Sequence, residues 1–194
     1  MMQEGTKIHG RLQSEAGDDY KAEVRLSYER ELKDTLFVLD GIADGIIITD
    51  SGVIIDEIKS TRANLDAIDE DYSLLHWIQA KCYAWMYCHR KDIESITVRL
   101  TYVNVDTEEI KQLHEDYNYD DLEHFIEDLI GQYQRWTNLS ISLKSKRDKS
   151  IQELVFPFDH YRKGQRELAA NVYRGVRDKQ ALFAQAQCQY CFPL

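Results

Sequence analysis

Apolar and polar residues along the chain follow two periods, one typical of strands and one typical of helices. Ile8 and Leu12 lie one helical turn apart among polar residues, which predicts a leading helix over 3–16. The segment 22–30 instead alternates with a period of two, which is typical of a strand with one solvent-facing side. We expect Gly17 to separate the two elements.

A pair of strands rich in acidic residues should follow. Segment 36–48 is apolar and β-branched enough for a buried strand, although Asp-Gly pairs at 40–41 and 44–45 interrupt it. The Asp-Ser-Gly sequence at 50–52 suits a hairpin turn into a second strand over 53–58. The sequence therefore predicts a strand-turn-strand unit that carries carboxylates.

The second half of the chain is predicted to be mostly helical. Helices are expected over 73–90, 119–139 and 164–185, with a strand over 96–105 and a basic linker around 144–149. The expected buried positions are Leu75, Ile78, Cys82, Trp85 and Met86 in the first of these helices, and Leu122, Phe125, Ile126, Leu129, Ile130 and Tyr133 in the second.

This order of elements predicts an α/β fold, with a central mixed β-sheet flanked by helices and a C-terminal helical tail. A chain of 194 residues is long enough for one domain with its own core and an appendage. We place the domain at 1–150 and the tail at 151–194.

Charge is the property that fits nucleic-acid binding least. The formal net charge is -10, whereas nucleic-acid-binding domains are usually basic. Ten acidic residues lie between 106 and 128 against one lysine, so most of the excess is local and the rest of the chain is close to neutral. A structural protein whose acidic long helix binds a basic partner therefore stays open as an interpretation.

The absence of a membrane span, of a signal region and of a disulfide pattern predicts the compartment of the protein and the redox state of its cysteines. No segment approaches the roughly 18 to 20 consecutive apolar residues of a membrane span, and the N-terminus has no apolar signal region. We expect a soluble, cytoplasmic protein that does not bind membranes. The four cysteines, at 82, 88, 188 and 191, do not form a secreted disulfide pattern, so we expect reduced thiols.

Asp44, Glu57 and Lys59 are the residues with the clearest chemistry. The predicted hairpin brings Asp44 and Glu57 to the same end of the sheet, and Lys59 shares the face of Glu57 because strand side chains alternate. Two carboxylates can bind a divalent cation, and an ammonium group can position water or stabilise charge at a phosphate. This combination suits phosphodiester hydrolysis, with the backbone carbonyl of Ile58 as a further metal ligand.

The same residues resemble a known superfamily. The sequences Gly-Ile-Ala-Asp-Gly ending at Gly45 and Ile-Asp-Glu-Ile-Lys ending at Lys59 resemble the PD-(D/E)XK nucleases, most closely the RecB-like branch. The resemblance implies a restriction-endonuclease-like core, DNA as the substrate, Mg or Mn as the cofactor, and catalytic roles for Asp44, Glu57 and Lys59.

Three further positions match the RecB-like branch. There a histidine of the leading helix joins the metal site, which implies that His9 binds metal together with Asp44 and Glu57. A glutamine and a tyrosine one helical turn apart follow the lysine strand, and Gln79 and Tyr83 match them as DNA-binding or supporting residues.

Each motif alone has a simpler interpretation. Glu57 and Lys59 are also compatible with a solvated strand face, and His9 with an ordinary surface histidine. Gln79 and Tyr83 are compatible with a hydrogen-bonded pair that has no contact to DNA. Their joint occurrence in the expected order favours the nuclease interpretation.

The tail resembles the segment that opens the helicase core of DinG-type helicases. There an aromatic-Arg-x-Gly-Gln pattern contacts the adenine of ATP, and Tyr161-Arg-Lys-Gly-Gln165 matches it. No Gly-x-x-x-x-Gly-Lys-Ser/Thr phosphate-binding loop occurs, so we expect no helicase activity. We interpret the chain as the nuclease part of a truncated nuclease-helicase fusion, whose tail packs loosely or mediates self-association.

Cys188 and Cys191 have the spacing of half a zinc site but lack a second ligand pair. Some RecB-like nucleases hold an Fe-S cluster with one cysteine before the catalytic strands. No cysteine precedes Asp44, so we expect no Fe-S cluster here.

The sequence thus predicts a divalent-metal-dependent deoxyribonuclease, which we interpret as an exonuclease of DNA processing or repair. The alternative is a catalytically silent DNA-binding or assembly module left from the fusion. Metal-dependent cleavage separates the two, because only the enzyme turns over.

Overall fold

The computed structural model describes residues 2–33, 35–155 and 159–185. The chain divides into two compact units, 1–139 and 140–194, of which the first contains the whole sheet. Phe156-Pro157-Phe158 and the pair Cys188 and Cys191 lie outside the described residues. The expectation of reduced thiols at Cys188 and Cys191 therefore stays a prediction.

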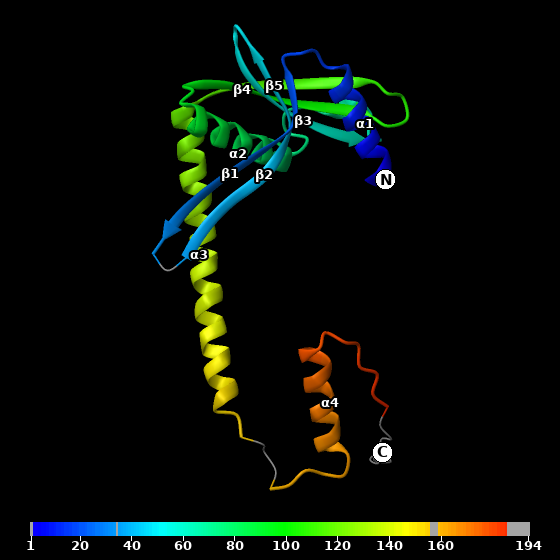
Figure 1. Cartoon of the computed structure of the whole chain (residues 1–194), viewed down its shortest axis with the longest axis vertical. Coiled ribbons are helices and arrows are strands. Elements are labelled where there is room, and N and C mark those ends of the chain that lie inside the picture. The colour runs from blue at the N-terminus through cyan, green and yellow to red at the C-terminus, as the bar shows by residue number, and fades with distance from the viewer. Residues whose placement is uncertain (1, 34, 156–158, 186–194) are drawn as a thin grey trace. The chain divides into compact units, whose positions relative to one another are not determined.

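A five-stranded mixed sheet is the centre of the first unit (Figure 1). The strands lie in sequence order, and every neighbouring pair is antiparallel except the third and fourth, which are parallel. A parallel pair needs a crossover connection, and the second helix provides it. The strands are β1 (Tyr20–Leu32), β2 (Thr35–Thr49), β3 (Gly52–Thr61), β4 (Ser95–Asn104) and β5 (Ile110–Asn118).

Helices flank this sheet, which confirms the predicted α/β fold with a mixed sheet and a C-terminal helix. In the unit that contains the sheet they are α1 (Met2–Glu15), the 3-10 helix η1 (Leu65–Ala67), α2 (Leu74–Lys91) and the first part of α3 (Tyr119–Gln152). The C-terminal helix α4 (Gln165–Arg177) belongs to the second unit. None of the described helices combines the length and apolar character needed to cross a membrane.

The core lies mainly between the sheet and α2, whose central residues from Cys82 to Cys88 are all buried. Leu122, Ile126 and Ile130 of α3 close the core as predicted. Two other predictions were wrong, because Leu75 is 74% exposed and Tyr133 is 54% exposed. Leu75 precedes Trp77, the first buried residue of α2, and Tyr133 follows Ile130, the last buried residue of α3, so both lie at the edge of the buried stripe of their helix.

The two Asp-Gly pairs were expected to interrupt the second strand, but β2 is continuous through both of them. Its glycines instead make room for tyrosine rings. A Cβ on Gly41 would lie 2.6 Å from Cε1 of Tyr83, and one on Gly45 would lie 2.0 Å from Cζ of Tyr20. Any larger side chain at Gly45 would displace the ring that packs there.

One unpredicted strand and two helix boundaries also differ from the predictions. β5 was not predicted, because as an edge strand it buries only Leu113 and shows no clear alternation. The expected linker at 144–149 is part of α3, since lysine and arginine are good helix formers. The last helix ends at Arg177 rather than near 185, and Lys179 just beyond it has a left-handed φ of 53°.

Candidate active site

At Asp44 the pairing of β2 with β1 is interrupted and its pairing with β3 ends. The pair Glu23 and Asp44 is missing from the otherwise continuous β1–β2 register, and Glu23 has a left-handed φ of 51°. The β2–β3 register also stops beside it, at Gly45. The backbone N–H of Ile58 is therefore not taken by β2, and it donates to Oδ2 of Asp44 over 2.8 Å. The carboxylate is held at the point where β2 diverges from β3.

Helix α1 holds Asp44 from the other side through two residues one helical turn apart. Nδ1 of His9 lies 3.4 Å from Oδ1 of Asp44, and Nε2 of Gln13 donates to the Asp44 backbone carbonyl over 2.9 Å. The hydrogen bond to Asp44 is the main cause of the raised pKa of His9. Sequence reasoning missed Gln13, although its i, i+4 spacing from His9 was a usable signal.

Glu57 and Lys59 share the α2 face of β3 and form a hydrogen-bonded chain with α2. Nζ of Lys59 donates to Oε1 of Glu57 over 2.6 Å and to Oε1 of Gln79 over 3.0 Å. Nε2 of Gln79 in turn donates to the hydroxyl of Tyr83 over 3.2 Å. The structure thus brings together the six side chains that the sequence singled out for the nuclease site, namely His9, Asp44, Glu57, Lys59, Gln79 and Tyr83.

The carboxyl of Glu57 is buried and incompletely paired. The residue is 2% exposed, and its Oε2 has no hydrogen-bond partner among the described residues. Burial, followed by the negative charge of Asp44, raises the pKa of Glu57 to about 7, while Lys59 and His9 act in the opposite direction. An unpaired buried carboxylate oxygen beside a second carboxylate is unfavourable unless a proton or a cation neutralises it.

The donors around this oxygen suit Mg²⁺ or Mn²⁺. Within the described part of the chain, no three His, Cys, Asp or Glu side chains already form a ready-made metal site. Mg²⁺ does not require one, because it commonly binds one or two carboxylates and keeps several waters. Asp44 and Glu57 supply two such carboxylates, and His9 supplies an imidazole beside them. The residues present therefore fit a hydrated divalent cation.

The raised pKa of Glu57 predicts a pH-dependent stability of the metal-free protein. Below pH 4.5 the carboxyl is protonated in both states, whereas up to about pH 7 only the folded state keeps the proton. Wild type should therefore lose stability relative to Glu57→Gln as pH rises through this window, by on the order of 2 to 3 kcal/mol. Thermal melts of both proteins, with and without Mn²⁺, measure the difference, and Mn²⁺ should remove it. If the stabilities of wild type and Glu57→Gln change with pH in the same way without metal, the prediction is wrong.

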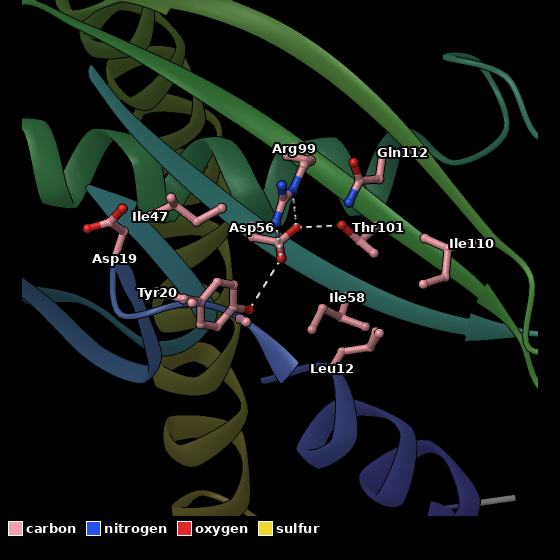
Figure 2. Close-up of a pocket in the computed structure, with 12 residues that line it drawn as sticks. Leu12, Asp19, Tyr20, Ile47, Asp56, Ile58, Arg99, Thr101, Ile110 and Gln112 are labelled. Atoms are coloured by element: carbon pink, nitrogen blue, oxygen red, sulfur yellow. Dashed lines mark hydrogen bonds and ion pairs between the residues drawn. The ribbon is translucent and has the colours of Figure 1, made fainter. Parts of the chain in front are cut away.

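A second polar cluster lies on the opposite face of β3 from Glu57 and Lys59 (Figure 2). Asp56 is buried and accepts two bonds of 2.8 Å from Arg99, one of 2.6 Å from Thr101 and one of 3.2 Å from Tyr20. These side chains line a cavity of about 370 Å³ between α1 and the sheet. All four donors satisfy Asp56, so the cluster anchors the segment that carries Glu57.

Comparison with known proteins agrees with this geometry. The sequence profile described as the PD-(D/E)XK nuclease superfamily matches residues 5–192. The chain belongs to this superfamily. Superfamily membership makes its core a metal-dependent nuclease fold.

Two other comparisons add little to the superfamily assignment. A search of curated proteins finds no match. Among solved structures, the chain is similar to the crystal structure of SSO0001, with 24% identity and a TM-score of 0.43 over 66% of this chain. The match spans 58% of the length of that chain.

Proposed function

We propose that this protein is a divalent-metal-dependent deoxyribonuclease that hydrolyses phosphodiester bonds with Asp44, Glu57 and Lys59. Oε2 of Glu57, which has no hydrogen-bond partner in the described part of the chain, supports the proposal most directly, because it lies beside a second carboxylate that the fold holds in place. Such an arrangement is costly in a structural protein and useful for binding a cation.

Each residue has a distinct role in this proposal. Asp44, Glu57 and His9 hold the metal, with the backbone carbonyl of Ile58 as a further ligand. When held there, Mg²⁺ or Mn²⁺ would supply polarisation of the phosphate and a lowered pKa of a coordinated water. Lys59 presents an ammonium group to the attacking water and the developing charge, and its bond to Gln79 keeps it oriented.

The finer assignments belong to the same proposal. We infer an exonuclease of the RecB-like branch that acts in DNA processing or repair, because His9, Gln79 and Tyr83 match that branch in addition to the catalytic residues. We also propose that the segment 151–194 derives from the start of a helicase and mediates self-association.

Metal binding tests the site without requiring turnover. We expect Mn²⁺ titration by calorimetry to show binding to wild type and an affinity at least roughly 100-fold weaker in Asp44→Asn, since this exceeds the effect of losing a supporting residue. Asp40→Asn is the matched control, because Asp40 lies on the same strand in an exposed pair with Arg25. Equal affinities in all three proteins would exclude the metal site.

Cleavage tests the function itself. Wild type should cleave labelled DNA with Mn²⁺ or Mg²⁺ and lose all activity in EDTA. End-labelled strands distinguish an exonuclease, which releases nucleotides from one end, from an endonuclease. DNA binding without cleavage in either metal would instead favour the catalytically silent DNA-binding module.

A further inference from the structure

The first turn of α2 carries residues that the proposed reaction does not use. His76 precedes Gln79 by three positions, so both lie on the same side of the helix. Nδ1 of His76 lies 2.9 Å from the hydroxyl of Tyr102, which is the partner of Lys59 in the β3–β4 ladder. This end of α2 therefore lies next to the Lys59 side of the active site.

His76 presents a neutral hydrogen-bond donor there. Burial and the charge of Lys59 lower the pKa of His76, while burial raises the pKa of Tyr102 to about 12. Tyr102 is buried, and its hydroxyl can donate to Nδ1 of His76 over 2.9 Å. In the tautomer that accepts this bond, Nε2 of the half-buried imidazole carries the ring proton.

Tyr72 places an aromatic ring beside this donor. Its ring meets that of Tyr102 edge to face, with centroids 5.7 Å apart, yet the residue is 43% exposed. The loop that carries it is held in place, because Tyr72 N–H donates to the Asp69 carbonyl over 3.2 Å and Nε1 of Trp77 donates to the Glu70 carbonyl over 2.9 Å. An ordered, half-exposed ring next to a reaction centre can contact a substrate with little loss of entropy.

The surrounding charges indicate which part of a nucleotide contacts the ring. Asp69, Glu70 and Asp71 directly precede Tyr72 and disfavour a phosphate there. Leu75 adds exposed apolar surface on the next turn. An exposed aromatic ring is a common platform for stacking a nucleobase.

We propose that Tyr72, Leu75 and His76 form a nucleobase subsite, in which the base next to the scissile phosphate stacks on Tyr72 and accepts a hydrogen bond from His76. This inference rests on the proposed nuclease function. A base inside a duplex is already stacked and paired, so the subsite takes an unpaired base. The preferred substrates are therefore single strands or frayed ends.

Binding of the full chain to a fluorescent single-stranded oligonucleotide, followed by anisotropy in EDTA, tests the subsite without cleavage. We expect Tyr72→Ala to bind roughly 5- to 100-fold more weakly than wild type, and Tyr72→Phe to bind like wild type, because phenylalanine keeps the stacking face. Tyr173→Ala is the matched control, since Tyr173 is an exposed tyrosine of α4, outside the unit that contains the sheet.

A scan with single abasic nucleotides shows whether the ring contacts a base. One abasic position should weaken binding by wild type and leave binding by Tyr72→Ala unchanged, which an indirect structural effect would not produce. The inference is wrong if Tyr72→Ala binds like Tyr173→Ala, or if every abasic position weakens both proteins equally. If wild type cleaves DNA and Tyr72→Ala binds it normally, the subsite alone is wrong. If wild type neither binds nor cleaves DNA, the proposed function is wrong as well.

Discussion

Replacing Lys59 by alanine is expected to slow DNA cleavage by roughly 100- to 1000-fold, the cost of removing one group that stabilises charge in a transition state. Lys59 donates to Glu57 and Gln79, so its ammonium group is fixed at the carboxylates rather than free in solvent. Single-turnover cleavage with saturating Mn²⁺ measures the chemical step.

Two controls separate this effect from a loss of structure. Lys59→Ala should still bind Mn²⁺ at a pH where Glu57 is ionised, because both carboxylates remain. Lys21→Ala removes an exposed lysine of β1 and should cleave at the wild-type rate. If Lys59→Ala cleaves as fast as Lys21→Ala, the proposed role of Lys59 is wrong.

Replacing Arg99 by alanine is expected to destabilise the fold by about 3 to 5 kcal/mol, because it leaves the buried carboxylate of Asp56 without its cation. Asp56 and Arg99 are linked by two bonds of 2.8 Å and are both largely buried (Figure 2). For a protein of this size each kcal/mol lowers Tm by roughly 2 to 4 °C. Thermal or urea unfolding should therefore show a large shift.

The chain offers a matched pair of controls for this prediction. Arg25→Ala breaks the exposed ion pair with Asp40 and should cost less than about 1 kcal/mol. The double replacement of Asp56 by leucine and Arg99 by methionine removes both charges and should recover much of the stability lost in Arg99→Ala. Similar losses in Arg99→Ala and Arg25→Ala would show that the buried pair is not an anchor of β3.

Local pattern predicted much of the candidate site. Because strand side chains alternate, Glu57 and Lys59 had to share a face, and the structure places their charged atoms 2.6 Å apart. Helical spacing likewise put Gln79 and Tyr83 on one side of α2, where they are hydrogen-bonded. Their chemical roles stay predictions that the cleavage and metal-binding experiments test.

Other features could not be predicted from local pattern. β5 lacks a clear alternation because an edge strand needs only Leu113 in the core. In the sequence nothing separates Asp56 from the other acidic residues of this chain. Only its burial against Arg99 and Tyr20 distinguishes it from a surface residue. Tyr72 and Tyr102 are thirty positions apart, so no spacing rule links them.

The sequence by itself thus determined the elements that carry the candidate site, their order, and which of the candidate side chains share a face, because these depend on periods of a few residues. Only the tertiary structure decided that β2 leaves β3 beside Asp44 and that α1 brings His9 and Gln13 to that point. It also decided that Glu57 is buried with one carboxylate oxygen that no described residue pairs. These properties depend on contacts between distant segments, which the packing of the whole domain determines.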